Sequence, residues 1–475
     1  MSVLDASAHP APLSTRAELK ALGLLTAPIL ASQLAQASYG FIDTLMASQV
    51  SALDLAAVAV GSGIWLPLFL FITGILLATT PLVAEAYGAN QRQRIAGITH
   101  QAMWLALGVG VIGFIIVRHA YPLFEWLGVP PQLREMTQRY LLGVSWGMPA
   151  VGLFFALRCY CEAQDQPVPV MIISVSGLSL NVAFNTLFIH GSESISWLAW
   201  LPVHIPAMGG PGCGWATSVV LWLMSGIMLG YLLLSRRFQH ARLMQAWEAP
   251  KWSEIKTIAA LGLPIGLAIF FEVSTFALVA VLVSPQGVLA VAGHQVALSL
   301  TSFLFMVPLS MAIALTIRVG QFYGARDFAA ILHVRRVGLI ITTCIAASMA
   351  LILLFGRHAI TEIYTDDAAV RALAAQLLLF AVFYQIVDAL QVAAAGCLRG
   401  LQDTKSPMRL TLFAYWGVAI PVGYLAGSTT FFGGQSWGPH GYWLGIVLGL
   451  TVASILLMWQ LGRTLNAVKA RWQIA

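Results

Sequence analysis

Twelve long apolar segments, joined by short polar connections, constrain the fold of this 475-residue chain more than any other feature. Each segment is long enough for a tilted membrane-spanning helix of about 20 residues. Only 9% of the residues are charged, against about 25% in soluble proteins. The predicted spans are 21–48, 55–83, 95–117, 140–160, 168–190, 213–235, 257–284, 288–317, 337–356, 372–398, 409–427 and 441–462. The chain is therefore predicted to be an all-α integral membrane protein with twelve transmembrane helices.

The distribution of Lys and Arg over the connections predicts how the chain is inserted. Basic residues near span ends favour the cytoplasmic side of a membrane. With twelve spans, 20 of the 25 Lys and Arg residues fall on the side that also holds both tails. Both termini are therefore predicted to be cytoplasmic. The net charge of +6 is spread over these short loops, which argues against binding to nucleic acid.

The two halves of the chain resemble each other. Pro28 and the Tyr-Gly-Ala triplet at 87–89 recur as Pro264 and the same triplet at 323–325, 236 positions later in both cases. A constant offset over such a distance indicates a duplication. Because each copy holds an even number of spans, the copies are predicted to be parallel six-helix repeats, related by an axis along the membrane normal.

The repeats predict a chain organised as two lobes around a central cavity. The N-terminal lobe is expected at 1–240, a cytoplasmic linker at 241–256 and the C-terminal lobe at 257–475. Two helical lobes with a cavity between them form the architecture of transport by alternating access.

Three acidic residues, Asp43, Glu272 and Asp388, lie inside otherwise uncharged apolar segments. A carboxylate in the middle of a bilayer costs roughly 2.5–3.5 kcal/mol on insertion scales. A chain keeps such a residue where it faces a protein interior or a wet cavity, commonly on an ion or substrate pathway. We therefore predict that all three are ion-coupling residues. Glu272 and Asp388 are expected to share one site for a proton or a metal cation, with sodium as the metal considered.

A structural interpretation of these acids remains as an alternative. Glu272 would then be a protonated carboxyl that hydrogen-bonds a neighbouring helix, and Asp43 a polar residue near the outer interface. The position that matches Glu272 in the first repeat is Gln36. A titratable group thus stands where the other half has its neutral isostere, which favours a role specific to the second lobe.

Other polar residues are predicted to join a polar cluster or to line the substrate cavity. Asn181 and Asn185 are four residues apart, so they lie on one helix face and are expected to form a first-lobe cluster with Asp43. The alternative is a pair of amide contacts between packed helices. The remaining residues assigned to this group are Gln36, Tyr384 and His294, the last of which could equally be a satisfied polar residue near a helix start.

The sequence lacks nucleotide-binding, nucleophile-elbow and zinc motifs. We therefore expect no cofactor and no enzymatic activity. Without a nucleotide site, the energy for transport has to come from an ion gradient.

Four motifs, read in order along the chain, carry a family resemblance: residues 40–44, 271–273, 292–297 and 388–400. Together they make the chain similar to the multidrug and toxic compound extrusion family, and most of all to its NorM-type bacterial branch. The resemblance covers nearly the whole chain. It implies a twelve-helix, two-lobe exporter of cationic amphipathic drugs and dyes, driven by sodium or proton influx across the bacterial inner membrane. It also implies that Asp43, Glu272 and Asp388 are the coupling residues and that Asn181 and Asn185 belong to the first-lobe cluster.

Two other functions are weighed against this antiporter. A flippase of lipid-linked precursors has a similar architecture, but it should line its cavity with several Arg to hold pyrophosphate, and the middles of the predicted spans contain none. An intramembrane lipid transferase would need clustered acids at an interface, whereas the three acids here lie in three distant spans. The expected partners are small cationic or amphipathic organic molecules, a proton or sodium and the lipid bilayer, with the protein acting as a monomer.

Overall fold

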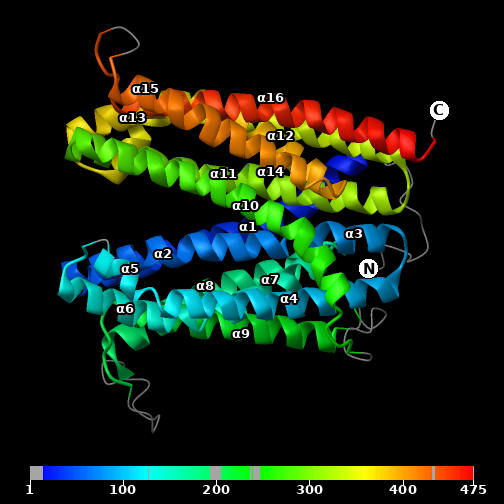
Figure 1. The fold of residues 1–475 in the computed structure, drawn as a ribbon, viewed down its shortest axis with the longest axis horizontal. Coiled ribbons are helices and arrows are strands. Elements are labelled where there is room, and N and C mark those ends of the chain that lie inside the picture. The colour runs from blue at the N-terminus through cyan, green and yellow to red at the C-terminus, as the bar shows by residue number, and fades with distance from the viewer. Residues whose placement is uncertain are drawn as a thin grey trace. The chain divides into compact units, whose positions relative to one another are not determined.

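The structure of the protein is a computed structural model that describes residues 14–126, 128–192, 205–235, 238, 247–430 and 434–473. Within these ranges every regular element is a helix (Figure 1). In chain order the elements are α1 (Thr15–Ser48), α2 (Ala52–Leu76), α3 (Thr79–Gly88), α4 (Arg92–Arg118), α5 (Tyr121–Trp126), α6 (Pro131–Ser145), α7 (Met148–Glu162), α8 (Pro167–His190), α9 (Gly212–Leu234), α10 (Trp252–Val283), η4 (Ser284–Gln286), α11 (Val288–Gly324), α12 (Phe328–Tyr364), α13 (Ala368–Gly400), α14 (Lys405–Leu412), η5 (Phe413–Ala419), α15 (Ile420–Ser428) and α16 (Pro439–Arg471).

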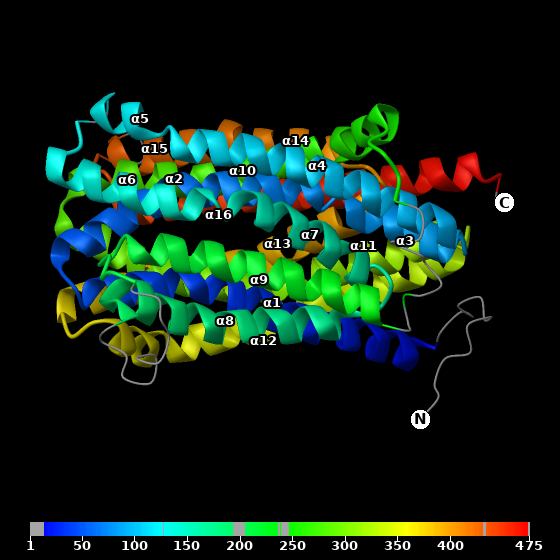
Figure 2. The same ribbon diagram turned by 90° about the horizontal axis from the view of Figure 1, so that it is seen from below.

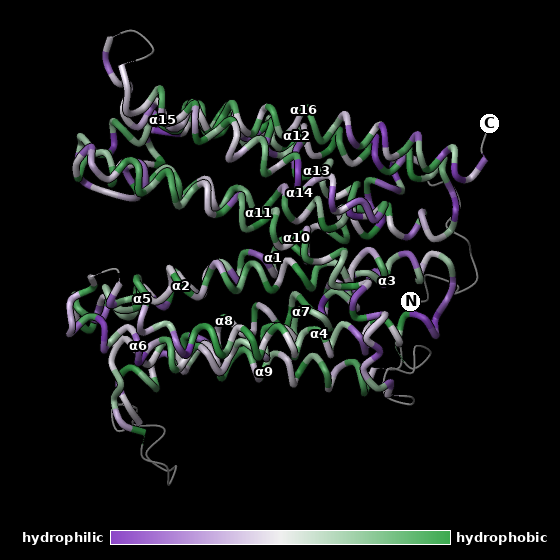
Figure 3. Tube along the Cα trace, viewed as in Figure 1, coloured by the Kyte–Doolittle hydropathy of each residue, from purple (hydrophilic) through white to green (hydrophobic). Residues whose placement is uncertain are grey.

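The length and hydropathy of these helices suit a membrane. Among the described residues, ten helical stretches are long and apolar enough to cross it, and α6 with α7, bent by 40° at their junction, make an eleventh. Helix α1 is 34 residues long and completes the twelve predicted segments. Hydrophilic residues gather toward the helix ends (Figure 3). The prediction of an all-α membrane protein with twelve transmembrane helices is confirmed, while the central cavity stays a prediction.

Contacts divide the chain into two compact units. We call residues 31–83 and 91–266 the N-terminal unit, and residues 1–30, 84–90 and 267–475 the C-terminal unit. Helices α1 and α10 therefore each contribute residues to both units.

These units differ from the predicted lobes because residues 1–30 and 84–90, predicted for the N-terminal lobe, belong to the C-terminal unit. The unit boundaries cut α1 after Leu30 and α10 after Gly266, in each case two residues beyond a proline inside the helix. The lobe boundaries at 240 and 257 stay a prediction, and residues 241–246 of the predicted linker lie outside the described part of the chain.

The duplication is visible in the backbone. Asn90 and Arg326, which are 236 positions apart, both adopt a φ of 57° directly after matching helix ends. Within the C-terminal unit those helix ends also contact each other reciprocally. A Cβ atom on Gly88 would overlap the carbonyl oxygen of Gln321, and one on Gly324 would overlap the backbone of the residue that matches Gln321 in the first repeat, Glu85. Glycine is needed at both positions because two backbones meet there.

In the N-terminal unit, α4 packs on α7, and α9 packs on α6, α7 and α8. Figure 2 shows α8 and α9 running side by side. The segment before α10 is attached to α4 of the same unit. Gln101 Nε2 donates to the carbonyl of Ala249 at 3.1 Å, and Trp104 Nε1 donates to the carbonyl of Glu248 at 3.1 Å. The Glu248 carboxylate also accepts a hydrogen bond from Lys251, which raises the pKa of that exposed ammonium.

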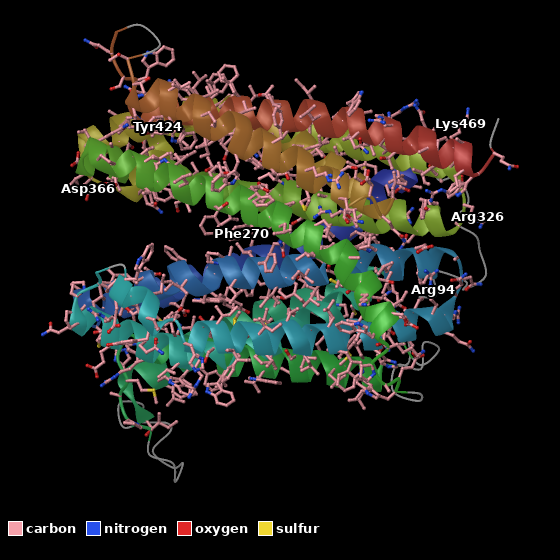
Figure 4. All side chains as sticks on the ribbon, in the orientation of Figure 1. Arg94, Phe270, Arg326, Asp366, Tyr424 and Lys469 are labelled. Carbon is pink, nitrogen blue, oxygen red and sulfur yellow. The ribbon has the colours of Figure 1, made fainter. Side chains whose placement is uncertain are left out.

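In the C-terminal unit, α13 is the central helix, packed against α11, α12 and α16 (Figure 1). Asp327 and Asp367 cap the N-termini of α12 and α13 by accepting backbone N–H bonds, at 2.9 Å from Ala330 in the first case. Figure 4 shows Arg326 and Lys469 at one end of this unit and Asp366 at the other.

A buried ion pair attaches the start of α1 to α11 inside the C-terminal unit. Arg318 donates to both carboxylate oxygens of Glu18, with Nε–Oε1 at 3.0 Å and Nη2–Oε2 at 2.8 Å. Its Nη1 donates to Gln321 Oε1 at 3.0 Å. Both ionised side chains are buried, so each is compensated mainly by the other.

We expect Arg318→Met to destabilise the protein by about 3–5 kcal/mol, because it leaves the Glu18 carboxylate buried without a counter-charge. The measurement is the thermal unfolding midpoint of purified protein in detergent. Adding Glu18→Gln to Arg318→Met should recover most of the loss. The exposed pair Arg139–Glu135 supplies the control, where Arg139→Met should cost about 0–1 kcal/mol. Equal losses in the two single variants would contradict the analysis.

Candidate functional site

The Asp43 carboxylate lies inside the N-terminal unit and is hydrogen-bonded on both oxygens. Oδ1 accepts from Asn185 Nδ2 at 2.7 Å, and Oδ2 accepts from the Thr217 hydroxyl at 3.0 Å. Asn181 closes the network, since its Oδ1 accepts from Asn185 at 3.2 Å and its Nδ2 donates to Thr217 at 3.4 Å. All four side chains are buried. The structure thus brings Asp43 and the two asparagines together, and their role in ion coupling stays a prediction.

Gln36 lies in a different polar group of the same unit. Its Oε1 accepts from Arg158 Nη1 at 3.3 Å, and Arg158 Nε pairs with Glu162 at 2.7 Å. Both charged side chains are buried at the end of α7. Asp43 is therefore not the only buried charge in the first half. The sequence analysis overlooked this pair because it lies at the edge of the predicted span 140–160.

Glu272 and Asp388 lie near each other in the C-terminal unit, on α10 and α13. The two carboxyls interact electrostatically. Asp388 is 3% exposed, and among the described residues no side chain or backbone group hydrogen-bonds its carboxylate. The buried guanidinium of Arg399 interacts electrostatically with Glu272, but within the described residues it forms no ion pair at 4 Å or less. Two carboxyl groups, one half-buried and one buried, thus lie close together without an ion-pair partner among the described residues.

Tyr415 connects these two helices. Its hydroxyl donates to Gln391 Oε1 on α13 at 2.9 Å, and the side chain interacts electrostatically with the Glu272 carboxyl. Tyr415 lies in η5, a π-helical turn between α14 and α15. The next residue, Trp416, donates to the carbonyl of Phe271 at 3.3 Å, which holds this turn beside Glu272. Such π turns are rare and occur often at functional sites.

His294 and Tyr384 lie on the same side of the C-terminal unit, around Trp443. Trp443 Nε1 donates to His294 Nδ1 at 3.1 Å, and the rings of Tyr384 and Trp443 are 6.3 Å apart. Tyr384 also interacts electrostatically with Asp388, one turn further along α13. Tyr384 therefore borders the carboxyl pair, whereas the contact described for His294 is with Trp443, and the assignment of both residues to a substrate cavity stays a prediction.

The chemistry open to this site is that of oxygen ligands. Within the part of the chain that the structure describes, no group of three or more His, Cys, Asp and Glu side chains is arranged to hold a metal ion. A sodium ion at Glu272 and Asp388 would therefore need hydroxyl and amide oxygens as well, and Tyr415, Gln391 and Tyr384 carry such oxygens nearby. A proton would need only a carboxylate.

Several residues of both sites were missed by sequence reasoning. Thr217, Gln391 and Tyr415 are ordinary residues of apolar helices when read one span at a time. The signal that could have found Tyr415 is positional, because the first repeat has Gly177 at the matching place, 238 positions earlier. A bulky polar side chain in one copy and glycine in the other marks a difference between the copies.

The fold and these buried carboxyls define a membrane protein built from two copies of one helical repeat. A family model described as MatE matches each copy, at residues 28–187 and 264–425. The two matches begin 236 positions apart, as do the repeated proline and triplet, which confirms the duplication.

Known proteins resemble the chain over nearly its whole length. It is 45% identical to the probable multidrug resistance protein NorM of Acinetobacter baylyi, covering 94% of this chain and 96% of that protein. It is 42% identical to the multidrug resistance protein PmpM of Pseudomonas aeruginosa, covering 95% and 93%. The crystal structure of the eukaryotic MATE transporter AtDTX14 has the same fold, with a TM-score of 0.83, 18% identity and coverage of 96% and 99%. The chain belongs to the MatE family of multidrug and toxic compound extrusion proteins, in its NorM-like bacterial branch.

We expect Thr217→Val to destabilise the protein by about 1–3 kcal/mol, because the buried Asp43 carboxylate and Asn181 both lose a hydrogen-bond partner. The thermal unfolding midpoint measures this loss. Thr186→Val is the matched control, since the Thr186 hydroxyl bonds only to the carbonyl of Val182 in its own helix. In an Asp43→Asn background the cost of Thr217→Val should shrink, because the charge is gone. Equal effects of the two Thr→Val changes would contradict the assignment.

Proposed function

We propose that the chain is a cation-coupled multidrug antiporter that exports cationic amphipathic molecules by alternating access. The observation that carries the proposal is the carboxyl pair of Glu272, which is half-buried, and Asp388, which is buried, with no ion-pair partner for either among the described residues. Two uncompensated carboxylates in a membrane-spanning unit provide a binding energy for a cation that few other arrangements supply. Relatives named as multidrug resistance proteins support the choice of cargo.

The coupling follows from electrostatics. A proton or sodium ion that binds to Glu272 and Asp388 neutralises the charge that also attracts a cationic substrate. The affinity of the substrate then falls, and reciprocal linkage requires the substrate to lower the affinity of the ion by the same factor. Each partner thus favours release of the other, which is the requirement for antiport.

Asp43 is proposed as a second coupling position. Both of its oxygens accept hydrogen bonds, so a cation there competes with Asn185 and Thr217 for the carboxylate. The Glu272 and Asp388 pair has fewer such competitors and is proposed as the main site.

The buried arginines argue against the flippase alternative. Arg158 and Arg318 are neutralised by Glu162 and Glu18, so neither is available to hold a pyrophosphate. Among the buried arginines of the described helices only Arg399 lacks such a pair, whereas an anionic headgroup with two phosphates calls for several.

The proposed location is the bacterial inner membrane, with both termini in the cytoplasm. The distribution of 20 Lys and Arg on the side of the tails against 5 on the other supports this orientation. The protein is proposed to act as a monomer, to need no cofactor and to catalyse no chemical reaction.

Glu272→Gln and Asp388→Asn should leave folded protein in the membrane and abolish gradient-driven efflux, because each neutral isostere keeps the shape and removes the charge. The assay is efflux of a cationic dye from inverted vesicles with an imposed proton or sodium gradient. Glu254→Gln, on the exposed start of the same helix α10, and Asp366→Asn are the matched controls and should transport as the wild type does. Dye efflux at the wild-type rate in both test variants, at matched expression, would contradict the proposed coupling role.

Affinity for a cationic dye should fall as the pH is lowered from about 8 to about 5, because protonation removes the carboxylate charge that attracts the dye. If sodium is a coupling ion, replacing potassium by sodium at constant ionic strength should weaken binding as well. The measurement is dye binding to purified protein. If the dye affinity of the wild type changes with neither pH nor sodium, these carboxyls do not couple the ion to the drug.

A further inference from the structure

The ends of α3 and α11, which hold the repeated Tyr-Gly-Ala triplets, meet in a symmetric contact inside the C-terminal unit. Gly88 of the first repeat lies against the carbonyl of Gln321, and Gly324 of the second repeat lies against the carbonyl of Glu85. Glu85 matches Gln321 and Gly88 matches Gly324, in both cases 236 positions apart. When two copies present the same surface to each other, their contact lies on the axis that relates them.

Two backbones meet directly at this contact. A Cβ atom on either glycine would overlap a carbonyl group of the other helix, so only glycine allows this approach. The axis that relates parallel repeats is predicted to run along the membrane normal, which is also the direction of a transport path. A contact between backbones on that axis therefore closes the path at this point.

The contact lies where the spans end, on the side that holds both tails. Gly88 and Gly324 are the last residues of α3 and α11. Tyr323, beside Gly324, accepts a hydrogen bond at 3.4 Å from Arg471 at the end of α16. Repeats that rock between two states pivot around a site near the middle of the membrane. A contact at the ends of the spans is placed to act as a gate instead.

A hydrogen bond between side chains joins the two repeats at the same place. Gln402 Nε2 donates to Glu85 Oε2 at 2.7 Å. The residue after Gln402 is fixed to α16, because Asp403 Oδ2 accepts from Gln460 Nε2 at 2.9 Å and from the Thr464 hydroxyl at 3.0 Å. Glu85 and Gln402 are only half-buried, so water can replace their hydrogen bond and little free energy is lost when they part.

We propose that the ends of α3 and α11 form a gate on the cytoplasmic side, which is closed in this structure and opens once in each transport cycle. This inference rests on the proposed function and adds to it the place where the path is shut. When the gate opens, segment 84–90 leaves the C-terminal unit and the hydrogen bond between Glu85 and Gln402 breaks. Contacts within the second repeat, such as that between Asp403 and Gln460, persist.

Reversible crosslinking tests whether the contact has to open. In a chain whose five native cysteines are replaced, Glu85→Cys and Gln402→Cys are bridged by a short bis-methanethiosulfonate reagent, which dithiothreitol removes. Ser406→Cys with Gln460→Cys is the matched control, because Gln460 Nε2 donates to the Ser406 hydroxyl at 3.1 Å within the second repeat. The bridge in the test pair should abolish dye efflux from inverted vesicles, and dithiothreitol should restore it.

The bridge in the control pair should leave efflux unchanged. If efflux continues with the test pair bridged, the contact is a permanent pivot and the inference is overturned. Equal losses of efflux in the two bridged pairs would also overturn it, because any restraint on this side of the protein would then stop transport.

A distance measurement separates this inference from the proposed function. Spin labels on Tyr87→Cys and Lys405→Cys, which replace exposed residues of different repeats, should show two distances in liposomes, one for each state of the gate. Labels on Lys405→Cys and Arg463→Cys, both in the second repeat, should show one. If two distances appear in a protein that drives no dye efflux, the antiporter proposal fails and the gate stands. A single distance for the first pair under every condition of dye, proton and sodium would overturn the gate, even where efflux is normal.

The glycines give a test with the same labels. Gly324→Ala should shift the population toward the longer distance, because its Cβ overlaps the carbonyl of Glu85 when the gate is closed. Gly462→Ala is the control, since a Cβ on this helical glycine of the same unit has no atom within 4 Å. An unchanged distribution in folded Gly324→Ala protein would contradict a gate closed by these backbones.

Discussion

The cost of a carboxylate in a lipid-facing bundle governs the arrangement of the surrounding helices. Each deep acid has to be covered by protein, and the two units do this differently. Asp43 receives a hydrogen bond on each oxygen from α8 and α9, so its charge is largely satisfied by the chain. Asp388 is equally buried, yet no described group hydrogen-bonds its carboxylate, and its nearest acid is Glu272. Under the proposed function, a mobile cation would supply at the second site what the protein already supplies at the first.

Duplication explains why the two units have related sites with different chemistry. Gln36 and Glu272 occupy matching positions, 236 residues apart. In the first copy Gln36 accepts a hydrogen bond from Arg158, a tethered cation whose charge Glu162 neutralises. In the second copy, no described Arg or Lys lies at ion-pair distance from the Glu272 carboxylate. Under the proposed function, the same place in the repeat would hold a permanent cation in one copy and an exchangeable one in the other.

The sequence predicted the twelve spans, the repeat and the three deep acids because these depend on hydropathy, spacing and charge. It also predicted that Asn181 and Asn185 share a helix face with access to Asp43. It did not predict the bend between α6 and α7 or the π turn at η5, since both arise from packing between distant helices. Tyr415 could not be selected for the same reason, because its partners Gln391 and Glu272 come from other helices. Gln36 accepts a hydrogen bond from Arg158, a partner that was not foreseen, and its role at the substrate site stays a prediction.

The two proposed coupling acids of α1 and α10 lie on the helices that belong to both units. Asp43 lies in the part of α1 that packs in the N-terminal unit, while the start of that helix is attached to α11 of the C-terminal unit by the Glu18–Arg318 pair. Glu272 lies in the part of α10 that belongs to the C-terminal unit. The segment just before α10 is attached to α4 of the N-terminal unit through the hydrogen bond from Trp104 to Glu248. In each helix a proline lies two residues before the unit boundary, and a proline inside a helix is a place where the helix can bend. Under the proposed function, each acid would therefore lie on one side of a bend point, on a helix whose other part is attached in the other unit.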